Sequence, residues 1–485
     1  MTLSLASCEQ ARLARDARFD GLFFTAVKTT GIYCRPVCPA PPPKPANVEY
    51  FAHAAAAESA GYRPCLRCRP ELSPADSQWR RGDDIVARAV QLIDDGALDT
   101  DSVAELARRL HVGERHLRRL FVDTLGVAPM QLQATRRLLF AKQLLSETAL
   151  PITDVALASG FQSLRRFNDA FLRAYGMAPA RLRQSPRQTH SSGPIVLRLN
   201  YRPPFDFAAS LAFLQRRALP GIEDVSEQRY RRVLDESGAW FELTAQPSHE
   251  PALQLSLHGV AAAALPGIVR RVRRMFDLDA NPQTTHALLG QDALLAPLIA
   301  ARPGLRMPAG WDAFEVAVRA VLGQQVSVAA ATTLARRLVE RHGRPLATPI
   351  DAALHSLFPT PAQLADAQLA DIGLPAKRAA TLAAVARALA DGEVDFAREQ
   401  SLEQFVERWT ALPGIGDWTA QYIAMRGLAH PDAFPAGDLI LRKQAGAGTP
   451  ISEKLLRARA ERWRPWRSYA VMQLWQAANI EENRR

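Results

Sequence analysis

The sequence contains no apolar run that approaches the length needed to span a membrane, so we expect no membrane partner. Its first stretch, MTLSLASCEQARLARDARF, lacks the long apolar centre of a signal peptide, and we therefore expect a cytoplasmic protein. Cysteine is scarce, with five in 485 residues, yet four of the five lie in one short segment. Because cytoplasmic thiols stay reduced, this cluster predicts metal binding or catalysis rather than disulfides.

Positive charge is in excess: the net charge is +11 and the isoelectric point about 9.8. This balance favours contact with a polyanion, nucleic acid first and a membrane surface second, although a merely soluble basic protein would show it too. Polar, proline-containing stretches at 70–77 and 183–194 are typical of linkers. They predict a cysteine module over 1–75, a helical module over 83–184, and a larger region that we divide into 195–310 and 311–485.

The middle module contains a repeat at a shift of fifty residues: LFVDTLGVAPMQL at 120–132 matches AFLRAYGMAPARL at 170–182. Upstream of each copy lie a helical segment, a short break and a second helical segment with a polar or basic start, which is the pattern of a helix-turn-helix. The alternative is two solvated basic helices. The module resembles the AraC-type DNA-binding domain, which implies an all-α double helix-turn-helix that contacts promoter DNA. The expected DNA-contacting residues are Arg115, His116, Arg118, Arg119, Ser163, Arg165 and Arg166.

The clustered cysteines have the spacing C-x3-C, twenty-six residues, C-x2-C, which suits one tetrahedral zinc ion with four thiolate ligands. We expect Cys34, Cys38, Cys65 and Cys68 as ligands and Cys8 as a free thiol. A purely structural zinc is the alternative. A zinc-bound thiolate is also a ready nucleophile, and arginines beside the cysteines, Arg35 and Arg67 among them, could bring a phosphate to it.

The segments FFTAVKTTGIYCRPVC (23–38) and GYRPCLRC (61–68) closely resemble the N-terminal module of the Ada-type adaptive-response protein. The resemblance implies a small α+β module in which Cys34 takes a methyl group from a methylated DNA phosphate. Methylation would remove one negative charge and raise DNA affinity. The stretch after Cys38, CPAPPPKPANVEYF, is unusually proline-rich and predicts weaker phosphate contacts there. The family's other acceptor segment, Pro-Cys-His-Arg, has no counterpart, so we expect no repair of O6-methylguanine.

The C-terminal region contains LPGIGDWTAQYIAMRGLAHPDAFPAGD at 412–438. Its glycine turn, with Gly414 and Gly416, resembles a helix-hairpin-helix whose freed N–H groups hold a DNA phosphate. An ordinary corner between two helices would show the same sequence pattern. Together with segments 199–223, 318–331 and 462–475, it resembles the AlkA-type 3-methyladenine glycosylases over about 195–485. This implies an α+β glycosylase with a small antiparallel sheet and two helical lobes.

An alkylated purine is cationic and leaves readily, so the transition state needs a carboxylate rather than a general acid. Asp438 is the candidate; the alternative is a helix cap. The resemblance implies a base pocket of Phe213, Trp418, Tyr422 and Trp475, which would hold the flipped base by stacking and cation–π attraction. It places Gln325 at the wedge position, usually apolar, and Leu439 where an aromatic is usual. It also implies a monovalent cation on the backbone of Thr410, Leu412 and Ile415.

These patterns together predict a multidomain fusion: a sensor of methyl phosphotriesters, a transcription activator and an alkyl-base glycosylase. Its partners would be alkylated and promoter double-stranded DNA and, as an activator, RNA polymerase. It would need one zinc and no organic cofactor, and three DNA-contacting modules make a monomer sufficient. Two alternatives stay open, a zinc-containing DNA-binding regulator without glycosylase activity and a repair enzyme that its front modules merely localise.

Overall fold

The computed structural model describes residues 3–75, 85–183, 193–246 and 250–483. They form two compact units. The first comprises Met1–Pro203, Gln246–Arg270 and Leu278–Asn281, and the second Pro204–Ala245, Arg271–Asp277 and Pro282–Arg485. The expected linker at 183–194 lies largely outside the described residues, as do residues 76 and 77 of the first one. Among the described helices, none is both long and apolar enough to cross a bilayer.

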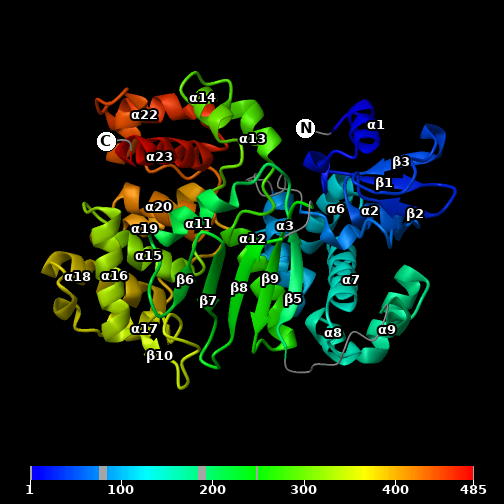
Figure 1. Ribbon diagram of the computed structural model, residues 1–485, viewed down its shortest axis with the longest axis horizontal. Helices are drawn as coiled ribbons and strands as arrows, with labels where there is room; N and C mark the ends of the chain where they lie inside the picture. Colours follow the sequence, from blue (N-terminus) through cyan, green and yellow to red (C-terminus); the bar gives the residue numbers. More distant parts are fainter. Residues whose placement is uncertain (1–2, 76–84, 184–192, 247–249, 484–485) are drawn as a thin grey trace. The chain divides into compact units, whose positions relative to one another are not determined.

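The cysteine module is a four-stranded sheet in the order β3-β1-β2-β4 (Figure 1). β1 pairs antiparallel with β2 and β3, and β4 adds parallel to β2. Phe24, Ala26 and Tyr33 form its buried core, and Leu139, from the next module, packs against that core. Its elements are α1 (Leu5–Ala14), β1 (Phe24–Val27), β2 (Ile32–Cys34), β3 (Val48–Phe51), α2 (Ala54–Ser59) and β4 (Arg63–Pro64).

Both predicted helix-turn-helix units are confirmed, as α5–α6 and α8–α9. The fifty-residue repeat has a structural cause. Gly126 and Gly176 end α6 and α9 in the left-handed conformation, with φ of 72° and 68°, and Pro129 and Pro179 open the helices that follow. The helices are α3 (Ile85–Asp94), α4 (Ala97–Thr100), α5 (Val103–Arg109), α6 (Glu114–Leu125), α7 (Pro129–Glu147), α8 (Ile152–Ala158), α9 (Leu164–Tyr175) and α10 (Pro179–Leu182).

The first unit also contains an antiparallel pair of strands, in which β5 (Ile195–Asn200) aligns with β9 (Ala252–His258). The second unit begins with α11 (Phe207–Gln215) and an antiparallel run of β6 (Glu223–Val225), β7 (Arg229–Val233) and β8 (Trp240–Ala245). α12 (Leu265–Met275) belongs partly to each unit. The expected small antiparallel strands are therefore present.

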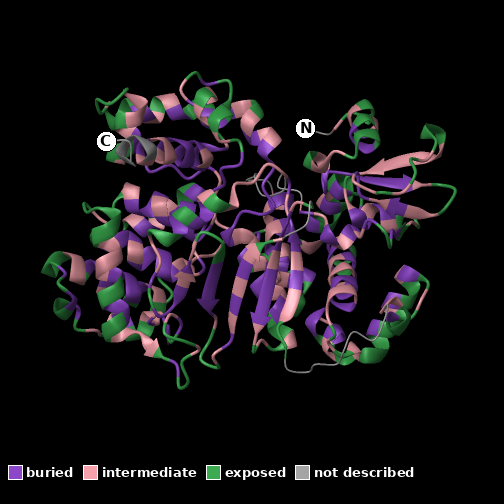
Figure 2. Ribbon diagram, viewed as in Figure 1, coloured by how far each residue is buried: buried purple, intermediate pink, exposed green. Residues whose placement is uncertain are grey.

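The rest of the second unit is helical, as predicted, apart from a short ladder of β10 (Arg344–Pro345) with β11 (Ser356–Leu357). Its helices carry both buried and exposed positions (Figure 2), and most of the buried side chains are apolar. The helices are α13 (Pro282–Leu289), α14 (Ala296–Ala301), α15 (Ala313–Leu322), α16 (Val328–His342), α17 (Pro361–Ala365), α18 (Ala376–Ala390), α19 (Leu402–Thr410), α20 (Asp417–Gly427), α21 (Leu439–Ala445), α22 (Glu453–Ala460) and α23 (Arg467–Asn483).

Candidate functional site

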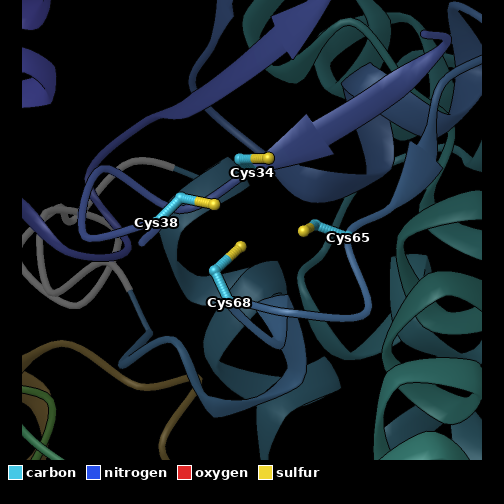
Figure 3. Close-up of side chains that lie close together, drawn as sticks. All are labelled: Cys34, Cys38, Cys65 and Cys68. Carbon is cyan, nitrogen blue, oxygen red and sulfur yellow. The ribbon is translucent and has the colours of Figure 1, made fainter. Parts of the chain in front are cut away.

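The four cysteines converge on one point. Their sulfur atoms all lie within 4.8 Å of one another, and the side chains point toward a common centre (Figure 3). Cys34 ends β2, Cys38 lies in the turn that follows, and Cys65 and Cys68 lie just after β4. The backbone N–H of Arg35 donates to Cys68 Sγ at 3.3 Å, and that of Arg67 to Cys65 Sγ at 3.4 Å. A tetrahedral ion with metal–sulfur bonds of about 2.3 Å fits such a set, and four thiols favour zinc.

The arginines beside the cysteines lie differently from one another. The side chain of Arg35 is buried, forms an ion pair with Asp20, and donates to the main-chain oxygen of Cys68 at 3.0 Å. This corrects the expectation that Arg35 offers its guanidinium to a DNA phosphate, because its donors are turned inward to hold the cysteine loop. Arg67 is exposed, so the expected phosphate contact stays open for that residue.

A cavity of about 730 Å³ adjoins Cys34, Cys38 and Cys65. The proline-rich segment forms one of its walls and is fastened by α1, since Arg15 Nη2 donates to the carbonyl oxygens of Pro39 at 3.2 Å and Ala40 at 3.3 Å. Basic side chains, Arg63 and Arg67 among them, line it too. A polyanion with a small apolar substituent matches this mixture of charged and apolar walls.

Helix α7 fixes the cysteine module to the helix-turn-helix module. Lys142, 1% exposed, donates to the main-chain oxygen of Cys65 at 3.0 Å and to Glu71 Oε2 at 2.7 Å. On the same helix, Thr135 donates to Glu58 at 2.5 Å, and the other carboxylate oxygen of Glu58 accepts from Tyr33 at 2.9 Å. Buried, fully paired contacts of this kind predict that the two modules fold and move together.

The predicted DNA-contacting helices present their basic residues to solvent. Phe121 and Phe171 are buried on the opposite sides of α6 and α9, and these anchor each helix. Ser163 caps α9 by accepting from the N–H of Arg166, so its hydroxyl already has a structural role. The exposed side chains are Arg115, His116, Arg118, Arg119, Arg165 and Arg166.

The turn between α19 and α20 requires glycine at position 414. Gly414 has a φ of +82°, and a Cβ there would lie 2.0 Å from Thr381 Oγ1. Gly416 is the N-cap residue of α20. Gln324 Nε2 donates to Gly414 O at 3.0 Å and to Thr419 Oγ1 at 3.1 Å, which ties the α15–α16 loop to the hairpin.

The wedge candidate lies at the tip of that loop. Gln325 is exposed and has a φ of +57°, a conformation that L residues rarely adopt. Because its neighbour Gln324 is fixed to the hairpin, the loop holds Gln325 at a set position beside the expected phosphate grip.

Asp438 caps α21 and also meets two indoles. Its Oδ1 accepts the N–H of Leu441 at 3.0 Å and Trp475 Nε1 at 3.3 Å, while Oδ2 faces Trp418 Nε1 at 3.4 Å. The carboxylate is only half-buried. The helix cap is therefore confirmed, while the catalytic role of Asp438 stays a prediction about a carboxylate that two indole N–H groups also contact.

Of the four predicted pocket aromatics, Trp418 and Trp475 contact this carboxylate and Tyr422 lies beside their rings. Trp418 and Tyr422 stack with ring centroids 5.3 Å apart, and Tyr422 lies 6.1 Å from Trp475. Phe213 is buried, and the guanidinium carbons of Arg217 and Arg426 lie 3.8 Å and 4.6 Å from its ring centroid. The structure thus places two cations against Phe213, where the sequence predicted a ring free to contact a base.

Family models match nearly the whole chain: the metal binding domain of Ada at 7–71, a helix-turn-helix domain at 106–185, the AlkA N-terminal domain at 196–312, and the HhH-GPD superfamily of base excision DNA repair proteins at 318–466. A probable bifunctional transcriptional activator/DNA repair enzyme AlkA from Mycobacterium tuberculosis H37Rv is 42% identical over 96% of this chain and 95% of its own length. The chain belongs to this activator/repair family.

Two further relatives each match only part of the chain. DNA-3-methyladenine glycosylase 2 of Escherichia coli is 39% identical over 57% of this chain and 95% of its own length. The Ada activator/repair enzyme of the same organism is 41% identical over 26% of this chain and 35% of its own length. A solved 3-methyladenine DNA glycosylase from Archaeoglobus fulgidus shares the fold, with a TM-score of 0.50 and 22% identity over 57% of this chain and 96% of its own.

In this family member, sequence reasoning missed three groups of the site: Arg217, Gln324 and Arg426. Arg217 follows Phe213 by four residues, a helical spacing that could have suggested a contact with its ring. Arg426 follows Tyr422 by the same spacing on α20, and both line one small cavity, so that pair carried a signal too. Gln324 carried none, since its partners Gly414 and Thr419 are distant in sequence.

Proposed function

We propose that this chain senses methylated DNA phosphates, activates transcription, and excises alkylated bases such as 3-methyladenine. Asp438 carries the glycosylase part: a carboxylate oriented by two indole N–H groups lies beside the Trp418–Tyr422 stack. This is an anion next to electron-rich rings, which is what a cationic base and a positively charged sugar transition state require.

In the excision step, the bond between the sugar and the alkylated base breaks, and its electron pair goes to the base, which leaves neutral. Asp438 stabilises the positive charge on the sugar until water adds and loses its proton to the surrounding solvent. The aromatic rings hold the base, and Gln325 fills the space that the flipped base leaves. Leu439, 52% exposed, replaces an aromatic and leaves one side of the site open, which favours a broad range of bases.

In the sensing step, Cys34 Sγ attacks the methyl carbon of a methyl phosphotriester. The sulfur–carbon bond forms, the carbon–oxygen bond breaks, and the phosphate leaves as an ordinary diester anion. Zinc held by Cys34, Cys38, Cys65 and Cys68 keeps these sulfurs anionic at neutral pH. The product thioether carries no charge, so the repulsion between the cysteine module and DNA falls, and α6 and α9 hold the promoter more tightly.

Further partners follow from this proposal. As an activator, the DNA-bound chain would contact RNA polymerase. The carbonyl oxygens of Thr410, at the end of α19, and of Leu412 and Ile415, in the turn before α20, would bind a monovalent cation that strengthens the phosphate grip of Gly414 and Gly416. Exchange of potassium for a bulky organic cation should then weaken binding to undamaged duplex DNA.

One incubation tests the proposal. Methylated duplex DNA is mixed with the chain, and the released bases are measured by chromatography. The masses of the cysteine-containing peptides are then measured by mass spectrometry. We expect free alkylated purine and one added methyl group on Cys34. Base release with an unmodified Cys34 would leave a glycosylase without the sensor. Methylated Cys34 without base release would leave a regulator without the enzyme.

A further inference from the structure

The sheet of the cysteine module presents one face to its core and the other to the cavity beside Cys34. On β1, Ala26 belongs to the buried core, and successive side chains of a strand alternate between the two faces. Thr25 and Val27 therefore lie on the opposite face. Their partners on the antiparallel strand β2 are Cys34 and Ile32, respectively. All four of these residues line the cavity of about 730 Å³, so the cavity covers the face that carries the expected nucleophile.

Thr25 is the direct cross-strand neighbour of Cys34, which ends β2 (Figure 3). The Cβ atoms of such neighbours in an antiparallel pair lie about 4.5–5.5 Å apart, with both side chains on the same face. A polar group on Thr25 can therefore reach a molecule that contacts Cys34 Sγ.

The hydroxyl group of Thr25 is buried without a partner. The residue is 2% exposed, and within the part of the chain that the structure describes its Oγ1 forms no hydrogen bond. An unpaired hydroxyl in a protein interior costs stability. Valine has nearly the same shape and suits a strand equally well, so the packing of the sheet does not explain a threonine at this position.

We propose that Thr25 Oγ1 donates a hydrogen bond to the phosphate oxygen that Cys34 displaces during methyl transfer. The proposal rests on the sensing function above and names a further catalytic residue for it. Cys34 Sγ bonds to the methyl carbon while the carbon–oxygen bond breaks, and the electron pair of that bond stays on the oxygen. The neutral triester thereby becomes an anionic diester. The hydroxyl of Thr25 keeps its proton and donates to the oxygen that gains charge.

The geometry of the displacement suits a donor at this position. The sulfur, the methyl carbon and the leaving oxygen lie nearly on a line, with sulfur and carbon about 3–3.5 Å apart before reaction. The leaving oxygen lies one bond length further, which is close to the spacing between cross-strand neighbours. More than one staggered rotamer is common in strands, so a rotation about the Cα–Cβ bond of Thr25 brings its hydroxyl to the cavity.

Such a hydrogen bond acts on the rate more than on binding. The oxygen of a neutral triester is a weaker acceptor than that of an anionic diester, because hydrogen bonds to charged groups are about twice as strong as those between neutral groups. The bond therefore strengthens as the carbon–oxygen bond breaks. A donor that is stronger in the transition state than in the bound substrate accelerates the chemical step.

The variant Thr25→Val tests this role, because it removes the hydroxyl and keeps the shape. The rate of methyl transfer from a methyl phosphotriester duplex to Cys34, followed by peptide mass, should fall at least about tenfold. Thr25→Ser keeps the hydroxyl and should stay within about threefold of the unaltered chain. Ser159→Ala is the matched control. Ser159 is 3% exposed and its hydroxyl is likewise unpaired among the described residues, but it does not line the cavity, so transfer should be unchanged.

Two measurements that do not depend on transfer separate catalysis from a structural role. The urea midpoint of Thr25→Val should equal or exceed that of the unaltered chain, since the variant removes an unpaired buried hydroxyl. Affinity is measured with a duplex that carries one methylphosphonate linkage, whose phosphorus–carbon bond the thiolate does not break. It should change by less than about twofold.

The possible results are distinguishable. An unchanged rate in Thr25→Val would overturn the proposal, and a lower urea midpoint beside it would show a structural hydroxyl. A faster rate would also overturn it, because the hydroxyl would then bond to the sulfur of Cys34. Loss of affinity for the methylphosphonate duplex as large as the loss of rate would place the hydroxyl in DNA binding and contradict the catalytic role. No methyl group on Cys34 of the unaltered chain would instead contradict the proposed sensing function.

Discussion

The guanidinium of Arg202 donates from Nε to the main-chain oxygen of Asp20 at 2.7 Å, across 182 residues of sequence. The same side chain, 0% exposed, donates to the carbonyl oxygens of Pro74 at 3.0 Å, Ala75 at 2.6 Å and Asp279 at 2.7 Å. Asp20 in turn binds Arg35 beside the cysteine cluster. One arginine thus joins the cysteine module to segments that match the AlkA N-terminal domain.

This relationship predicts that Arg202→Met destabilises the whole first unit. Methionine fills part of the space but leaves buried carbonyl oxygens without donors, which should cost at least about 3 kcal/mol. Hydrogen exchange should become faster in β5 and in β1 together, and zinc should be released at lower urea concentrations.

A surface arginine of the same unit is the control for this change. Arg108, whose side chain is 74% exposed, pairs with Glu105 one turn away, so Arg108→Met should cost less than about 1 kcal/mol. If Arg202→Met cost no more than Arg108→Met, the buried carbonyl contacts would not hold the unit together.

The local features of this chain could be predicted from its sequence, and the long-range ones could not. The four-cysteine spacing and the fifty-residue repeat follow from metal geometry and helix-capping rules that act within a few residues. The buried position of Arg35 depends on Asp20, and that of Lys142 on Glu71, 71 residues away. No pattern within a short window distinguishes such an arginine or lysine from a surface one that would bind DNA.

Asp438→Asn separates the two roles of this residue. Asparagine caps helices as well as aspartate does, so the fold and DNA affinity should persist. Loss of the negative charge should lower single-turnover base release by about 100-fold to 1000-fold. Asp312→Asn is the matched control, since Asp312 caps α15 through the N–H of Glu315 at 3.0 Å and lies outside the aromatic site. Equal rates in the two variants would contradict a catalytic role for Asp438.

The cysteines should differ sharply in reactivity toward methylated DNA. Cys8 is 4% exposed, and burial raises the pKa of its thiol, so it stays protonated and inert at neutral pH. Cys8→Ser should retain one zinc per chain and full methyl uptake, whereas Cys34→Ser should take up none. Methylation of Cys8, measured by peptide mass, would contradict the idea that metal-bound charge decides which cysteine reacts.

His430 should make the second unit sensitive to acid. Burial, with Arg398 nearby, lowers its pKa to about 4, so the folded state keeps the ring neutral. The unfolded chain takes up a proton below about pH 6.5, and the free energy of unfolding should therefore fall as pH drops from 6.5 toward 4. The expected loss is on the order of 2 kcal/mol.

His430→Gln cannot take up that proton, and its amide oxygen can replace the ring nitrogen that accepts the N–H of Asp432 at 3.1 Å. Unfolding monitored by tryptophan fluorescence between pH 4.5 and 7.5 should show a shallower loss in the variant. Parallel pH curves for the two proteins would mean that the acid sensitivity arises from other groups, because only the titration of His430 separates them.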